Sequence, residues 1–157
     1  MIRIHFLNLV PWEGFRMNST ELLQVLIKTN PFEILDSDIL ETLSAKMTVK
    51  AFEPNTYVFK QEDPSRDALF IIASGLVELT VTDDRGMETV VGLKRAYDFF
   101  GETVVLSRER YPASARVKKK LTCGLIYRKL GQIHGFMTGS QGRNVLHCPI
   151  YFIGNAL

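Results

Sequence analysis

A series of short apolar segments between residues 47 and 128, separated by turn sequences, constrains the fold of this chain more than any other feature. The segments have the length and composition of β-strands, and residues typical of turns lie between them. We expect strands at 47–52, 56–61, 68–74, 76–82, 87–93, 113–117 and 121–128. Short strands at this spacing predict a β-sandwich or an antiparallel β-roll of the jelly-roll type.

Three turns between these strands can be identified from their residues. Glu-Pro-Asn at 53–55 separates the first two strands, and Gly75 separates the third from the fourth. Asp-Asp-Arg-Gly at 83–86 predicts a β-hairpin between the fourth and the fifth strand.

Two amphipathic helices are predicted before the strands. The first starts with Ser19 or Thr20 as its N-cap, and Asn30-Pro31 ends it. The second follows Asp36 or Ser37. Their apolar residues share one face: Leu22, Leu23, Leu26 and Ile27 in the first helix, and Ile39, Leu40 and Leu43 in the second. Because these stripes are one-sided, both helices should lie on a larger body, and the predicted fold is mainly β with flanking α.

A length of 157 residues allows one domain with short appendages. We place the domain at 17–128, an unassigned leader at 1–16 and an atypical tail at 129–157, with Met1 and Met17 both open as the start. The two cysteines predict no disulfide framework, so we expect a reducing, cytoplasmic setting. No apolar run approaches the roughly 18 residues of a membrane span, so we expect no membrane association.

The strands are interrupted between residues 98 and 115 by a Gly-Glu pair and one apolar helical turn. Gly101 permits close approach of a ligand, and the amides of Glu102, Thr103 and the next residue are unpaired at the start of a helix, where they can bind an anion. The Glu102 carboxylate can also accept hydrogen bonds from ligand hydroxyls. From these residues alone, a helix start after a glycine turn is the favoured interpretation.

This arrangement resembles the cyclic-nucleotide-binding domain family, which includes the sensor domains of catabolite-activator and fumarate-nitrate-reduction regulators. The resemblance runs from about residue 30 to residue 128 and is carried by three segments. They are Tyr-Val-Phe-Lys-Gln-Glu-Asp at 57–63, the apolar hairpin around Gly75 at 69–79, and Asp-Phe-Phe-Gly-Glu at 98–102 followed by Ala-Ser-Ala-Arg-Val at 113–117. The last segment resembles the phosphate-binding cassette of the family.

The resemblance implies roles for individual cassette residues. In the family, the glycine and glutamate that match Gly101 and Glu102 meet the ribose, and an arginine pairs with the cyclic phosphate. That arginine position falls on Tyr111, and its small neighbour falls on Pro112. Arg110 is one residue away, and in an extended segment it would point to the opposite face. Arg108 and Arg116 are weaker substitutes.

The candidate ligand-binding residues are Gly101, Glu102, Thr103, Arg110, Tyr111, Pro112, Ala113 and Ser114. The implied effector is a cyclic nucleotide, cyclic AMP or cyclic GMP. Burial of a phosphate without a cationic partner costs roughly several kcal/mol. A different ligand, or a pocket that binds no ligand, is therefore the alternative.

Metal catalysis on the predicted β-roll is disfavoured, because the three histidines, at 5, 134 and 147, all lie outside 47–128. Two cysteines and two of these histidines have the residue types of a zinc site, but their spacing matches no paired motif. No Ser-His-Asp signature or P-loop is present, so we expect neither an enzyme nor a metal site.

All 17 acidic residues lie in 1–109, whereas 8 of the 19 Lys and Arg residues lie in 110–157. We interpret 118–120, Lys-Lys-Lys, as a solvated turn rather than a phosphate-binding patch. Residues 129–157 contain several glycines and no acidic residue, and they match no recognition helix, so we expect no direct DNA binding by this chain. We also hypothesise that the chain is truncated, or read in an altered frame, after residue 128.

We therefore predict a non-catalytic regulatory domain that binds a small-molecule effector and signals by a conformational change. The change would be read by a protein partner, by a second copy in a homodimer, or by a missing output domain. The alternatives are the sensor part of a truncated DNA-binding regulator and a degenerate domain that binds no cyclic nucleotide.

Overall fold

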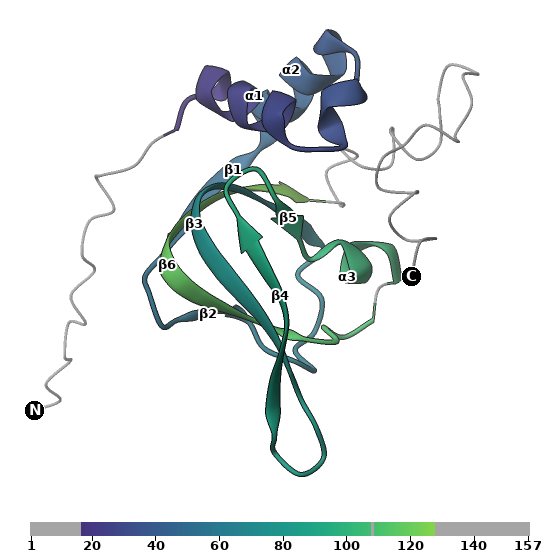
Figure 1. Ribbon diagram of the computed structural model, residues 1–157. Coiled ribbons are helices and arrows are strands. Elements are labelled where there is room, and N and C mark those ends of the chain that lie inside the picture. The colour runs from purple at the N-terminus through teal and green to yellow at the C-terminus, as the bar shows by residue number, and fades with distance from the viewer. Residues whose placement is uncertain (1–16, 108, 128–157) are drawn as a thin grey trace, which may run out of the picture.

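The computed structural model describes residues 17–107 and 109–127 (Figure 1). Two helices precede an antiparallel β-roll, and a short helix interrupts the strands late in the chain. The elements in order are α1 (Ser19–Lys28), the 3-10 helix η1 (Phe32–Ile34), α2 (Ser37–Lys46), β1 (Thr48–Phe52), β2 (Tyr57–Phe59), β3 (Ala68–Thr82), β4 (Glu88–Arg95), β5 (Phe99–Phe100), α3 (Glu102–Ser107) and β6 (Ser114–Tyr127). The predicted fold class is confirmed.

Both predicted N-terminal helices are present, and each has an apolar face. The N-cap of α1 is Asn18 rather than Ser19 or Thr20, because the Asn18 side chain accepts a hydrogen bond from the Glu21 amide while the Glu21 carboxylate accepts one from the Asn18 amide. The buried face differs from the predicted one in one place, since Ile27 is 41% exposed. Val25 is buried instead.

β6 is the central strand of the sheet. It pairs with β3 along one side and with β1 and β2 on the other, and β4 extends the sheet beyond β3 in the order β1-β6-β3-β4. The short β5 pairs with the first part of β3. All of these pairings are antiparallel, so the two longest strands form the frame on which the other elements are arranged (Figure 1).

Two of the predicted strand breaks are wrong. The chain does not turn at Gly75 but continues as one strand, β3, and residues 118–120 belong to β6 rather than to a solvated turn, although all three lysines are exposed. Gly75 has φ +112°, and a Cβ there would lie 2.5 Å from the Lys120 carbonyl oxygen. The pairing of β3 with β6 is irregular around Gly75, but it continues on both sides of this residue.

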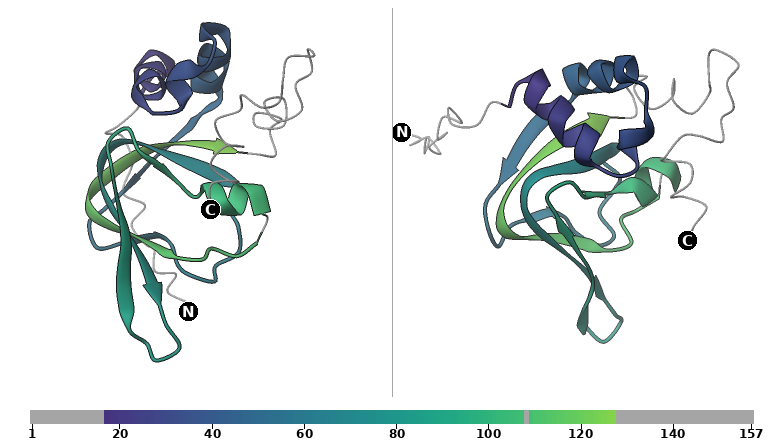
Figure 2. Two further views of the ribbon diagram at one scale, coloured as in Figure 1. Left: turned by 45° about the vertical axis from the view of Figure 1, so that its right-hand side comes forward. Right: turned by 45° about the horizontal axis from the view of Figure 1, so that its top comes forward.

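The two faces of β3 belong to two different apolar cores. Leu69 and Ile71 pack with α1, α2 and η1 in a core between the helices and the sheet. Phe70 and Ile72, which alternate with them, pack inside the roll. The views in Figure 2 show the helices lying across one end of the roll. The larger core inside the roll contains the aromatic rings that surround the candidate site.

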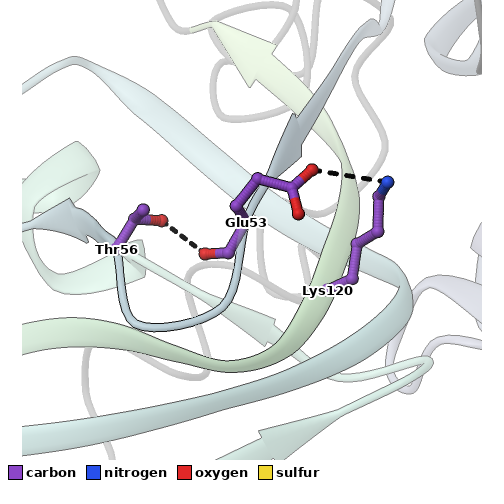
Figure 3. A network of polar contacts seen from close by, with 3 residues as sticks. All are labelled: Glu53, Thr56 and Lys120. Carbon is purple, nitrogen blue, oxygen red and sulfur yellow. Dashed lines mark hydrogen bonds and ion pairs between the residues drawn. The ribbon is translucent and has the colours of Figure 1, made fainter.

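The predicted turn at 53–55 is confirmed, and it contacts the central strand β6 through an ion pair and a backbone hydrogen bond. The Thr56 hydroxyl donates to the Glu53 carbonyl (2.7 Å), and the Glu53 carboxylate lies 3.3 Å from the Lys120 ammonium (Figure 3). Both charged side chains of the ion pair are about two-thirds exposed, so it adds little stability. The backbone amide of Asn55 also donates to the Val117 carbonyl, which places β2 beside β6.

The predicted hairpin at 83–86 is also confirmed. The Gly86 amide donates to the Asp83 carbonyl, and the Asp83 carboxylate accepts from the amides of Arg85 and Met87. Among the residues that the structure describes, no helix is long and apolar enough to cross a membrane. The predicted leader at 1–16 and the predicted tail at 129–157 lie outside the described residues. The hypothesis that the chain is truncated or read in an altered frame after residue 128 concerns the same undescribed tail.

Candidate functional site

The candidate cassette begins where β5 ends against β3. Phe100 lies directly opposite Phe70, and their rings stack with centroids 5.0 Å apart. Gly101 follows with φ +86°, and a Cβ there would lie 3.0 Å from the Phe70 ring and 3.3 Å from the Ala68 carbonyl oxygen. Glycine is therefore required at this position by both its backbone conformation and the close packing.

Helix α3 connects the two apolar cores. Val104 packs inside the roll, whereas Val105, the next residue, packs in the core formed with the N-terminal helices. Both side chains are 1% exposed. Glu102 at the start of the helix is half-buried and Thr103 is exposed. A ligand that displaces α3 would therefore disturb both cores at once.

Tyr111, at the expected arginine position, lies inside the roll. Its side chain is 1% exposed, and its ring stacks on Phe59 with centroids 3.6 Å apart and an interplanar angle of 8°. The phenol oxygen accepts a hydrogen bond from the Arg66 amide, with N and O 3.4 Å apart. Desolvation by burial raises the pKa of Tyr111 above its ordinary value of 10.0, so the phenol is neutral. An uncharged ring thus occupies the place that the resemblance assigns to a cation.

Hydrogen bonds hold the segment around Tyr111 against the turn that follows β2. The Tyr111 amide donates to the Asp63 carbonyl at 3.1 Å, and the Glu62 amide donates to the Tyr111 carbonyl at 2.8 Å. The Ser114 hydroxyl accepts from the Gln61 amide at 2.9 Å. These contacts fix the inward direction of the Tyr111 ring.

Arg110 lies on the outside of this segment. Its side chain is exposed, and its Nη1 donates to the Glu62 carbonyl at 2.6 Å. The structure therefore places Arg110 and Tyr111 on opposite sides of the segment, as expected for adjacent residues in an extended chain. Pro112 is exposed, Ala113 is half-buried and Ser114 is buried. Of the predicted binding residues, Tyr111 stacks on the Phe59 ring, and Gly101 has no room for a Cβ beside the Phe70 ring.

Arg116, another proposed substitute for the missing arginine, also lies away from the roll interior. It sits directly opposite Glu78, whereas the core residue Ala115 sits opposite Leu79. The Nε atom of Arg116 is buried and has no hydrogen-bond partner among the described residues. Arg108 lies outside the described residues. The described arginines of the cassette therefore do not take the inward position of Tyr111.

Two residues of the site were not predicted. Phe59 forms the surface on which Tyr111 stacks, and the Gln61 side-chain amide bonds to both backbone groups of Thr82, accepting at 2.7 Å and donating at 3.2 Å. Gln61 thus supplies Thr82, the last residue of β3, with the backbone partners that β6 does not provide, because β6 begins at Ser114 opposite Thr80. Both contacts join segments that are far apart in sequence, and no local pattern indicates them.

Comparison with known proteins agrees with this geometry. Residues 49–130 match the cyclic nucleotide-binding domain family, and this match covers more than half of the chain. The protein therefore belongs to the cyclic nucleotide-binding domain family, a class of regulatory ligand-binding domains.

The curated relatives include an ion channel and a regulatory protein. The chain is 32% identical over 107 residues to the probable cyclic nucleotide-gated ion channel 10 of Arabidopsis thaliana, covering 64% of this chain and 15% of the channel. It is 28% identical over 92 residues to the anaerobic regulatory protein of Bacillus subtilis, covering 58% of this chain and 38% of that protein. The chain thus spans well under half the length of these two curated relatives.

A solved structure shows the same fold. The sensor domain of the transcriptional regulator DNR from Pseudomonas aeruginosa superposes with a TM-score of 0.70 at 20% identity, covering 88% of this chain and 90% of that domain. The described elements therefore share the fold of that domain.

Proposed function

We propose that this domain is a non-catalytic sensor whose cassette binds a small-molecule effector, and that cyclic AMP and cyclic GMP are weak ligands of it. The observation that supports the proposal is the buried Tyr111 ring, stacked on Phe59 at the position where the family has its phosphate-binding arginine. A cyclic phosphate in the usual pose would be desolvated beside a neutral phenol, a loss that costs several kcal/mol, roughly. The effector is therefore one whose affinity does not depend on a cation at residue 111.

The route of the signal follows from α3. An effector that contacts Gly101 and Glu102 adjoins the first turn of this helix, whose Val104 and Val105 belong to different cores. A shift of α3 would therefore change the packing of α1 and α2 relative to the roll. The output would be a partner or a further domain that binds the displaced helices.

The proposal is tested by calorimetric titration of the full chain with cyclic AMP and cyclic GMP. We expect little heat with the unmodified chain. We expect Tyr111→Arg to bind at least about tenfold more tightly, because a charge-assisted pair with the phosphate is restored. Tyr111→Phe is the matched control, since it keeps the ring and adds no cation, and it should bind no better than the unmodified chain.

Tight binding of either nucleotide by the unmodified chain would overturn the proposal. Glu102→Ala then shows where the ligand sits, since a ribose contact at Glu102 predicts a loss of affinity in that variant. Circular dichroism of each variant confirms that it is folded before titration. If Tyr111→Arg does not fold, the weak affinity of the unmodified chain and of Tyr111→Phe still decides the outcome.

The likeness in fold to the sensor domain of the transcriptional regulator DNR supports a second candidate function, the sensor part of a DNA-binding regulator. In that case the described domain senses the effector, and its exposed lysines at 118–120 on β6 contribute to the contact with DNA phosphates. A mobility-shift assay with this chain and duplex DNA tests it, because binding by the basic residues of β6 predicts affinity that falls steeply with salt. If the duplex shows no mobility shift at any protein concentration, this chain does not bind DNA directly.

A further inference from the structure

The edge strand β4 carries an apolar stripe that faces solvent. Val90, Val91 and Leu93 are 53%, 59% and 49% exposed, and Met87 just before the strand is 67% exposed. Exposed apolar residues that occur singly need no explanation, but a contiguous group on one element marks an interaction surface. We define the β4 stripe as these four residues.

The three strand residues of the stripe, Val90, Val91 and Leu93, lie on the face of the sheet that points away from the roll interior. Leu93 pairs with Glu78, whereas Lys94 pairs with the core residue Val77. Residues opposite each other on neighbouring strands share a face, so Leu93 projects outward together with Glu78. In Figures 1 and 2 the β3–β4 hairpin projects beyond the rest of the described domain.

The charges at the two ends of β4 are opposite in sign. Glu88 begins the strand, Arg95 ends it, and both side chains are exposed. Exposure alternates over the last five residues of the strand, so Val91, Leu93 and Arg95 share the outward face. Glu88 pairs with Thr82, two places along β3 from the partner of Val90, so it shares that face too. The outward face of β4 is therefore acidic at one end, apolar in the middle and basic at the other.

We propose that two copies of this chain associate through their β4 stripes, packed antiparallel about a twofold axis near Val91. This arrangement places Glu88 of one copy over Arg95 of the second copy, and Val90 of one copy over Leu93 of the second. The pattern is self-complementary, as an isologous interface requires. A parallel arrangement would instead bring like charges together, which is unfavourable.

The geometry of β4 favours face-to-face packing over pairing of the two strand edges. The register of β3 and β4 shifts between Leu79 and Thr80, so that Val91 has no direct partner on β3. A bulge of this kind interrupts the regular edge that a second strand would need. It does not interrupt the apolar face, so the side chains carry the interface.

The test measures the mass of the full chain by sedimentation velocity over a wide range of concentrations. We expect a monomer–dimer equilibrium, and we expect Leu93→Asp to weaken dimerisation at least about tenfold, because it places a charge at the centre of the interface twice per dimer. Ile34→Asp is the matched control, since Ile34 on η1 is 62% exposed and lies outside the stripe. It should leave the equilibrium unchanged.

A charge exchange tests the antiparallel arrangement. Glu88→Arg and Arg95→Glu should each weaken the dimer, and the double variant should restore it, because every pair is then reversed. A monomer at every concentration, a dimer that is insensitive to Leu93→Asp, or a double variant weaker than both single variants would overturn the proposal. All four residues tested are exposed, so circular dichroism should show unchanged folding in each variant.

Discussion

Replacement of Tyr111 by alanine tests the central feature of the site, the packed ring at the arginine position. The side chain is 1% exposed, and the ring lies 3.6 Å from that of Phe59. Removal of a buried aromatic ring costs about 3–5 kcal/mol, which includes a stacking contribution of about 1 kcal/mol. This loss is a large part of the roughly 5–15 kcal/mol that stabilises a typical domain.

Two further variants separate the contributions. Tyr111→Phe keeps the ring and removes only the phenol oxygen, whose hydrogen bond from the Arg66 amide is long at 3.4 Å. We expect a loss of about 0.5–1 kcal/mol. Tyr57→Ala removes the same group from a residue that is 37% exposed, so it should cost markedly less than Tyr111→Ala.

The measurement is urea unfolding followed by circular dichroism. With a slope of about 2 kcal/mol per molar urea, a loss of about 4 kcal/mol lowers the midpoint by about 2 M. The order expected for the decrease is Tyr111→Ala, then Tyr57→Ala and Tyr111→Phe. If Tyr111→Ala lowers the midpoint no more than Tyr57→Ala does, the ring is not packed in the core and does not disfavour a phosphate at this position.

Two further variants test other parts of the fold. Gly75→Ala should cost more than about 2 kcal/mol, because the new Cβ would meet the Lys120 carbonyl at 2.5 Å, whereas Gly86→Ala, with φ +80° and open space, should cost about 1 kcal/mol in the same urea assay. Cys123 is buried, and burial raises its pKa from 9.0 to about 12. In a Cys148→Ser background its thiol should therefore resist maleimide at pH 8 until the chain unfolds, and rapid labelling of the folded chain would contradict this. Because the pKa of Cys123 is higher in the folded chain, its protonated thiol favours the folded state fully below pH 9, and this contribution is lost as pH rises towards 12. Cys123→Ala should therefore reduce the loss of unfolding free energy over this pH range in urea titrations.

The signalling that we propose depends on the position of α3. Val104 and Val105 are consecutive residues, so a rotation or shift of the helix cannot preserve the packing of both cores. Packed cores resist gradual deformation and change between discrete arrangements. The helices α1 and α2 are therefore the elements whose position would report an effector at the cassette.

Much of the fold is predictable from the sequence because it rests on local rules. The stop after α1, the turn at 53–55 and the hairpin at 83–86 each depend on residues within a few positions of one another. The Gly101-Glu102 pair was found in the same way, since a glycine followed by a short apolar helix is a local pattern. The continuity of the two long strands, β3 and β6, is not predictable in this way, because Gly75 indicates a turn unless its cross-strand partner is known.

The inward direction of Tyr111 required the tertiary structure. Adjacent residues in an extended segment point to opposite faces, so the sequence separates Arg110 from Tyr111 but does not say which of them faces the roll. The hydrogen bonds from Glu62 and to Asp63 decide this, and they connect segments about 48 residues apart. The sequence by itself determined the β-roll, its flanking helices and the departure from the usual arginine. Only the tertiary structure showed that the tyrosine ring fills that place, because long-range register sets the face that each residue presents.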